Sequence, residues 1–355
     1  MNLKNGIDLF KQYGLHDFTL RFMEWFDTKK RDRYYQNNIE KFLPGEDELN
    51  EQRKVKFEYA PLVSIVVPAY ETAPVFLRQL VDSVLEQTYS NLELCIADGS
   101  NTTIVKDTLN EYKDERISYI KLSKNDGISN NTNEGLDNAK GEYIALLDHD
   151  DLLTPNALYE MVKELNAHDK IPDMVYSDED KIVADTGKLI NPAFKPDLNE
   201  EFLRHTNYIC HFLMFSRELL DKVGGLNQEF DGAQDFEFVL RCNGAGADIK
   251  HVPKILYHWR IHPDSTAANP NSKLYAFENG NKAIKKYYTE NTVDVVVTVE
   301  AIGEEQQEQE EKWQGEKTVV SSVNAPKTSD ETKKMPFFFA IASAAGVILI
   351  YFSLK

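Results

Sequence analysis

Short apolar runs and helical stretches alternate along the first half of the chain. The apolar runs are rich in β-branched residues and leucine, as buried strands of parallel sheets are, and they lie at 63–67, 92–97, 117–122, 143–147 and 174–176. Between them, apolar residues recur with a helical period at 75–86, 129–139 and 155–167. This alternation predicts an α/β fold with a mostly parallel sheet and helices on both faces. Ligands of such sheets bind outside the carboxyl ends of the strands.

The segments that flank this pattern have a different character. Residues 1–60 are polar and helix-prone with a few aromatic residues, and we expect a helical extension packed on the main domain. A contact with a partner or a membrane surface is the alternative. The main domain is expected to cover 61–292, with later helices over 234–242 and 273–288. Residues 293–334 are expected to be an acidic flexible linker, because 302–334 lack core-forming residues; residues 293–300 could instead form a last strand.

Residues 335–354 are uncharged throughout. As a helix, a segment of this length would measure about 30 Å, the thickness of a bilayer core, so we expect a transmembrane helix. A buried core helix is the alternative. Lys333 and Lys334 precede the segment, and basic flanks stay on the cytoplasmic side; the sequence therefore predicts a single-pass anchor in the cell membrane with a cytoplasmic main domain. Ala342 and Gly346 form a small-xxx-small pair that would permit a homodimer.

Charge and cysteine content restrict the partners and the compartment. The chain has 58 acidic and 40 basic residues and a formal charge of −18. So acidic a surface repels phosphate backbones, and we therefore expect no nucleic-acid partner. Cys95, Cys210 and Cys242 show no C-x-x-C spacing, which is typical of buried free thiols in a reducing compartment.

The strongest chemical signal is an acidic pair at the end of the strand predicted at 143–147. Asp148 and Asp150 are two residues apart, so in an extended backbone both carboxylates lie on one side. Paired carboxylates bind hard divalent cations such as Mg²⁺ or Mn²⁺. Asp151 adds a third carboxylate. An EF-hand is excluded because Leu152 and Leu153 occupy positions that this loop needs for a ligand and a glycine.

Other polar residues are weaker candidates. Asp98 ends the second predicted strand, where an acid can accept hydrogen bonds from a nucleoside; an ordinary Asp-Gly turn is the alternative. The cluster 178–180 (Asp-Glu-Asp) is expected to have an acceptor-side or loop-capping role, although it could be mistaken for the metal site. His205 and His211 share no face with the acidic pair, and we expect both to be structural.

Several motifs in order over about 63–266 resemble glycosyltransferase family 2. The matching pieces are VSIVVPAYE, DSVLEQTYSNLELCIADGS, GISNNTNEGLDNAKGEYIALLDHDDLL, VYSDEDKI, FKPDLN, VGGLNQEFDGAQDFEFVLR and ILYHWRIHPDST. The resemblance implies a nucleotide-binding fold of the GT-A type. It is closest to the bacterial branch that builds cell-wall and surface polysaccharides, which includes rhamnosyltransferases.

The resemblance also assigns residues to roles. The nucleotide-sugar pocket would comprise Pro68, Ala69, Tyr70, Glu71, Asp98, Asn133, Asp148, Trp259 and Arg260. Asp148 and Asp150 would bind Mn²⁺ or Mg²⁺, with Asp150 the firmer ligand. His258 would complete the metal sphere, and His262 lies in the same segment that closes over the donor diphosphate. Asp235 would be the catalytic base. The chain departs from the family at Glu71, where asparagine is usual.

The function implied is that of an inverting, metal-dependent glycosyltransferase of hexosyl or rhamnosyl type. It would move a sugar from a nucleotide-diphosphate sugar to a hydroxyl of a growing polysaccharide or lipid-linked glycan. A sugar-nucleotide pyrophosphorylase is a rival, but the loop PAYETAP after the first strand has no glycine to cradle a triphosphate. A non-catalytic, membrane-tethered scaffold is a second rival, which the intact Asp148, Asp150 and Asp235 disfavour.

Overall fold

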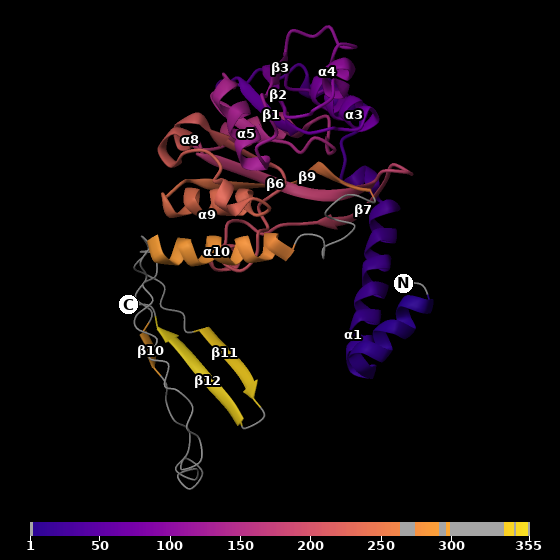
Figure 1. The fold of residues 1–355 in the computed structure, drawn as a ribbon, viewed down its shortest axis with the longest axis vertical. Helices are drawn as coiled ribbons and strands as arrows, with labels where there is room; N and C mark the ends of the chain where they lie inside the picture. Colours follow the sequence, from indigo (N-terminus) through magenta and orange to yellow (C-terminus); the bar gives the residue numbers. More distant parts are fainter. Residues whose placement is uncertain (1–2, 263–273, 291–295, 299–336, 344–345, 354–355) are drawn as a thin grey trace. The chain divides into compact units, whose positions relative to one another are not determined.

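The computed structural model describes residues 3–262, 274–290, 296–298, 337–343 and 346–353, which fall into two compact units, 1–280 and 281–355. The first unit is built on a nine-stranded sheet (Figure 1). Its strands are β1 (Val63–Ala69), β2 (Leu92–Asp98), β3 (Ile117–Lys121), β4 (Tyr143–Leu146), β5 (Leu152–Leu153), β6 (Met174–Val183), β7 (Lys188–Ala193), β8 (Leu213–Ser216) and β9 (Ile249–Ile261). Their order is β3-β2-β1-β4-β8-β6-β9-β5, and β7 pairs with β6.

One half of the sheet is parallel, as the sequence predicts. β3, β2, β1 and β4 are neighbours in that order, and Val63 of β1 is in register with Leu92 of β2 and Tyr143 of β4. Strands buried on both faces are continuous apolar runs, and β1 and β2 are buried almost throughout. The strands expected in this half are therefore confirmed.

The other half makes the sheet mixed, which differs from the expected mostly parallel sheet. β8 is antiparallel to both β4 and β6, β5 is antiparallel to β9, and β6 with β7 forms a hairpin. Only β6 and β9 are parallel in this half. The apolar pattern predicts neither β9 nor most of β6, because β6 runs through the charged residues 178–181 and β9 contains Pro253, and neither feature is typical of a buried strand.

Helices cover both faces of the sheet. They are α3 (Pro74–Leu85), α4 (Ile104–Leu109), α5 (Ile128–Asn138), α6 (Ala157–Leu165), α7 (Glu200–Leu203), α8 (Arg217–Val223) and α9 (Gln234–Gly244). Successive residues of β1 point to opposite layers. Ile65 packs in the core that also contains Leu77 of α3 and Leu158 of α6, whereas Val66 meets Gly135 of α5.

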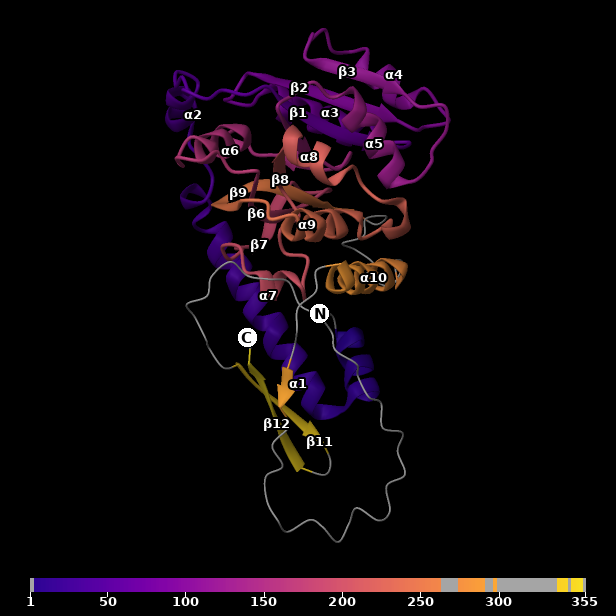
Figure 2. The same ribbon diagram turned by 90° about the vertical axis from the view of Figure 1, so that its left-hand side faces the viewer.

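The N-terminal segment is helical, in agreement with the expectation for residues 1–60. α1 (Leu3–Gln36) is followed by the short 3₁₀ turn η1 (Ile39–Lys41) and by α2 (Glu46–Gln52). α1 runs beside β7 (Figures 1 and 2). It is joined to the sheet by hydrogen bonds at Tyr35 and Asp32: the Tyr35 hydroxyl donates to Asp180 of β6 over 2.6 Å, and the Asn191 N–H of β7 donates to Asp32 over 2.7 Å.

The described part of the second unit is a short helical end and three strands. α10 (Leu274–Glu290) enters it from the first unit, and β10 (Val296–Thr298), β11 (Phe337–Ser343) and β12 (Gly346–Ser353) form an antiparallel sheet. The helix predicted over 335–354 is therefore not confirmed. Aromatic and β-branched residues suit strands as well as membrane helices, and periodicity cannot separate the two for an apolar run.

Among the residues that the structure describes, no helix is both long enough and apolar enough to cross a bilayer. The single-pass anchor, the cytoplasmic placement and the linker over 293–334 remain predictions from the sequence; most of the linker lies outside the described residues.

The contact between α5 and β1 yields a test of this packing. A methyl group added at Gly135 would lie 2.6 Å from Cγ1 of the buried Val66. We expect Gly135→Ala to lower the free energy of unfolding in urea by about 1 kcal/mol or more, since overpacking costs about 1–3 kcal/mol. Gly280→Ala is the matched control: it is also helical, its nearest neighbours would be 4.0 Å away, and we expect a gain of up to about 1 kcal/mol. Equal effects at the two positions would contradict the α5 packing.

Candidate active site

The carboxyl ends of β2, β1 and β4 lie side by side at one edge of the sheet. Ala69 at the end of β1 is in register with Asp98 at the end of β2, and Asp148 follows β4 on the other side of β1. The pairing therefore brings together three segments that the sequence assigned to the nucleotide-sugar pocket. Pro68 and Asp148 also line the pocket described below.

Asp98 and Glu71 shape the loops at this edge through internal hydrogen bonds. The buried Asp98 carboxylate accepts from the Ser100 N–H over 2.8 Å and from the Tyr119 hydroxyl over 2.7 Å. Glu71, with a φ of 48°, accepts from the backbone N–H of Thr102 and from its hydroxyl, and this side-chain hydrogen bond lowers the pKa of Glu71. The two carboxylates therefore hold their own loops in place.

The other nucleoside candidates fall into different positions. Tyr70 leaves 42% of its surface exposed next to Glu71, so its ring is accessible to a ligand. Asn133 of α5 uses both ends of its amide on the backbone of Leu226, donating to its carbonyl over 2.9 Å and accepting from its N–H over 2.8 Å. Asn133 therefore ties α5 to a neighbouring loop through one donated and one accepted hydrogen bond.

The three aspartates after β4 differ in their burial. Asp151 is fully buried; it accepts from the Tyr257 hydroxyl and, over 2.7 Å, from the Arg260 N–H. Burial raises the pKa of Asp151 well above its usual range, and the nearby Asp150 and Asp148 raise it further. Asp148 and Asp150 are partly exposed. Asp151 therefore joins the turn to β9, and the other two remain available to a ligand.

Within the described residues, His262 is in contact with the acidic pair, whereas His258 is not. His262 Nε2 lies 2.8 Å from Asp150 Oδ2. His258 is buried within β9, where its Nδ1 pairs with Asp180, the same carboxylate that accepts from Tyr35. No contact joins His258 to Asp148 or Asp150 in the described structure, so the geometry favours His262 as a metal ligand. The carboxylate of Asp180 is likewise occupied by buried hydrogen bonds with Tyr35 and His258.

Arg260 reaches the acidic turn from β9. Its Nε donates to the Asp150 carbonyl, and its guanidinium lies over the Phe76 ring at 4.5 Å from the centroid. Burial lowers the pKa of Arg260. Its Nη2 is buried and has no hydrogen-bond partner among the described residues, which leaves a donor for an anionic ligand. The neighbouring Trp259 instead makes a cation–π contact, with Lys181 Nζ 4.6 Å from the centroid of its ring.

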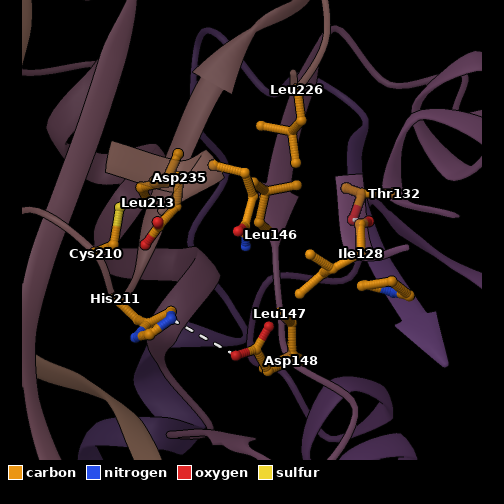
Figure 3. A pocket seen from close by; sticks show the side chains of 12 residues that line it. Ile128, Thr132, Leu146, Leu147, Asp148, Cys210, His211, Leu213, Leu226 and Asp235 are labelled. Carbon is orange, nitrogen blue, oxygen red and sulfur yellow. Dashed lines mark hydrogen bonds and ion pairs between the residues drawn. The ribbon is translucent and has the colours of Figure 1, made fainter. Parts of the chain in front are cut away.

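A pocket lies between Asp148 and Asp235 (Figure 3). Asp235 is in the first turn of α9, where the sequence predicts it, while the N-cap position belongs to Ala233. The Asp235 carboxylate accepts from Asn207 Nδ2 over 3.0 Å. Burial raises the pKa of Asp148, and the carboxylates of Asp150 and Asp235 act in the same direction while His211 opposes them.

His211 is part of this pocket, although the sequence analysis treated it as structural together with His205. Its Nε2 lies 3.7 Å from Asp148 Oδ2. Its ring stacks on Tyr257 at 4.9 Å between centroids and 15° between planes. Local sequence gave no signal for this placement, because His211 precedes β8 and meets Asp148 only through the pairing of β8 with β4.

A divalent cation fits this site only if a ligand completes the coordination. Among the described residues, no group of three or more histidine, cysteine, aspartate or glutamate side chains is arranged to hold a metal. Asp150 and His262 are in contact, and Asp148 is two residues away. Mg²⁺ is often held by one or two carboxylates together with substrate phosphates, so the oxygen and imidazole donors here suit Mg²⁺ or Mn²⁺ in the presence of a diphosphate.

The fold defines an α/β protein of the GT-A type, with an acidic turn at the edge of its sheet where the carboxyl ends of β1, β2 and β4 meet. Residues 64–224 match the sequence model of Glycosyl transferase family 2. This part of the chain therefore belongs to glycosyltransferase family 2, as the motifs in the sequence predict.

Three similar proteins illustrate the relationship. An uncharacterized protein of Sinorhizobium fredii is 40% identical over 67% of this chain and 26% of its own length. The glucosyltransferase WfaP of Escherichia coli, named for UDP-glucose and GlcNAc-diphosphoundecaprenol, is 29% identical over 63% of this chain and 86% of its own. A crystal structure of Staphylococcus aureus TarS with UDP-GlcNAc has a TM-score of 0.52 and 18% identity, covering 64% of this chain and 66% of that one. The last likeness concerns the fold alone.

The chain thus spans about a quarter of the length of the Sinorhizobium protein. Families of this fold host many substrates, so similarity does not decide the donor or the acceptor.

The buried state of Asp151 leads to a pH-dependent prediction. Because the pKa of Asp151 in the folded protein is above that of the unfolded chain, the folded state holds this proton more tightly. That stabilisation is complete below the ordinary aspartate pKa and is lost as pH rises through the folded value. Asp151→Asn is neutral at every pH, so we expect its unfolding free energy to rise relative to wild type between pH 4 and 8.

The measurement is urea unfolding at several pH values with EDTA present, and the difference between the two proteins should grow steadily with pH. Asp221→Asn, at an exposed carboxylate on α8, is the control and should show a constant difference from wild type. A constant difference for Asp151→Asn as well would mean that Asp151 is ionised throughout this range.

Proposed function

We propose that the protein transfers a sugar, with inversion, from a nucleotide-diphosphate sugar to a hydroxyl group. The observation that carries this proposal is that Asp148, at the end of β4, and Asp235, in the first turn of α9, line the same pocket (Figure 3). A donor held at the acidic turn would therefore present its sugar toward a carboxylate that can accept a proton. Inversion requires such a base on the side opposite the leaving group.

The nucleoside would bind at the carboxyl ends of β1 and β2. Tyr70 offers an exposed ring for a base, beside the loop that Asp98 and Glu71 hold. The name of WfaP includes UDP-glucose, and the crystal structure of TarS contains UDP-GlcNAc. We accordingly favour a UDP-sugar donor. A growing polysaccharide or a lipid-linked glycan is the proposed acceptor, the second by analogy with the acceptor in the name of WfaP.

The diphosphate would lie between the acidic turn and Arg260. Asp148 and Asp150 would repel a diphosphate unless a cation lay between them, and Asp148, Asp150 and His262 would hold Mn²⁺ or Mg²⁺. When bound, such an ion acts as a Lewis acid that stabilises charge on the leaving diphosphate. The free Nη2 of Arg260 can donate a charge-assisted hydrogen bond to a phosphate oxygen.

The chemical step is a single displacement. The acceptor oxygen forms a bond to the anomeric carbon, its proton passes to the Asp235 carboxylate, and the bond to the diphosphate oxygen breaks with its electron pair. Asn207 orients Asp235 through its 3.0 Å hydrogen bond. The positive end of the α9 dipole favours a carboxylate in the first turn.

Metal dependence can be tested with a pair of aspartate variants. We expect EDTA to abolish the hydrolysis of UDP-glucose, and Asp150→Asn to reduce it by at least about a hundredfold, the scale of a lost electrostatic contact in the transition state. Asp180→Asn is the comparison: it weakens the buried pair with Tyr35 and His258, so we expect a lower melting temperature and a milder loss of activity. If Asp180→Asn were the more damaging to activity, the metal site would have to be moved to β6.

The base assignment can be tested at Asp235. Because asparagine has nearly the same shape but accepts no proton, we expect Asp235→Asn to melt and bind donor almost normally while transfer falls by at least about a hundredfold. Glu237→Gln, on the same helix, should show the opposite pattern, since the buried Glu237 pairs with Arg241 at 2.7 Å and supports stability. Retention of most transferase activity by Asp235→Asn would rule out Asp235 as the base.

A further inference from the structure

A buried ion pair between Glu179 and Lys195 holds the backbone of His211 by hydrogen bonds to its N–H and its carbonyl. Glu179 of β6 accepts from the His211 N–H over 2.6 Å, and Lys195 Nζ donates to the His211 carbonyl. Lys195 and Glu179 also pair with each other at 3.2 Å, with side-chain exposures of only 5% and 11%. Such a buried pair needs well-placed partners to offset its desolvation. The position of residue 211 is therefore rigidly defined.

The imidazole ring is oriented as strictly as the backbone. It stacks on Tyr257, which is fully buried and donates its hydroxyl to Asp151, and the Trp259 ring lies 5.8 Å away. These contacts direct Nε2 toward Asp148 in the pocket (Figure 3). The other ring nitrogen, Nδ1, is buried, makes no hydrogen bond among the described residues and lies 3.9 Å from Glu179 Oε2. A phenylalanine ring could stack on Tyr257 equally well, so packing alone does not explain a histidine here.

The pair formed by His211 and Asp148 suits a hydroxyl group. A neutral imidazole can donate through Nε2, and a carboxylate accepts, so one hydroxyl can accept from His211 and donate to Asp148. The two groups are 3.7 Å apart, and both line the pocket that reaches Asp235. The sugar of a donor bound at the acidic turn would occupy this place.

We propose that His211 is a specificity-determining residue that, together with Asp148, binds one hydroxyl of the transferred sugar. This inference rests on the proposed function and adds to it: the enzyme selects its donor partly by a hydroxyl at this position. A site built to hydrogen-bond a hydroxyl discriminates against sugars that lack it, because its buried polar groups are then left unpaired.

The test uses His211→Phe, which keeps a stacking ring but has no nitrogen. Binding of UDP, UDP-glucose and the monodeoxy analogues of UDP-glucose is measured by calorimetry on the full chain with Mn²⁺. We expect an unchanged affinity for UDP, an affinity for UDP-glucose about tenfold weaker, and a melting temperature close to that of wild type. For the wild-type protein, one deoxy analogue should bind about tenfold more weakly than UDP-glucose. For His211→Phe, the same analogue and UDP-glucose should bind with equal affinity.

His205→Phe is the matched control, because His205 is exposed in the same loop and should tolerate the change in every measurement. Unchanged binding of UDP-glucose by His211→Phe would overturn the proposal, as would equal weakening of UDP and UDP-glucose. Normal donor binding and hydrolysis with loss of transfer alone would assign His211 to the acceptor, and would also overturn it. If wild type bound neither UDP nor any UDP-sugar, the proposed function itself would fail, and this inference with it.

Discussion

Two hydrogen bonds converge on the buried carboxylate of Asp151, one from the Tyr257 hydroxyl and one from the Arg260 N–H. They join the turn after β4 to β9, which is distant in sequence, and they continue the pairing of β5 with β9 into this turn. Asp148 and Asp150 lie in the same turn as Asp151, so this anchor also sets their position. Forming these bonds removes the carboxyl group of Asp151 from water. Because burial disfavours the charged form, the pKa of Asp151 is raised.

The same anchor extends to the pocket. Tyr257, whose hydroxyl is held by Asp151, supports the ring of His211, and Arg260, whose N–H is held by Asp151, directs its guanidinium toward the proposed diphosphate position. One buried carboxylate thus orients groups at both ends of the proposed donor, while Asp148 and Asp150 keep exposed oxygens for ligands. Two partly exposed carboxylates and one fully buried carboxylate lie within a few residues because burial differs sharply along this turn.

A second layer of buried polar groups stands behind the site. Tyr35 of α1, Asp180 of β6 and His258 of β9 form one chain of hydrogen bonds, and Lys195 with Glu179 forms another. Both join strands of the mixed half of the sheet to segments outside it. The charged stretch 178–180, which looks like a metal site in the sequence, therefore supplies structural pairs. Buried polar networks of this kind require every member to be satisfied, which makes them sensitive to substitution.

The amino-acid sequence was enough to predict the parallel half of the sheet, the acidic pair after β4, the position of Asp235 in the first turn of a helix, and the family. These features depend on local periodicity and short motifs, which are written in consecutive residues. The folded structure was needed to show that His262 and not His258 meets Asp150, that Asp151 and Asn133 tie elements together, and that His211 faces Asp148. It also showed strands where an apolar run predicted a helix. The reason is that register between distant strands and the burial of a polar group arise from long-range packing, which no local pattern specifies.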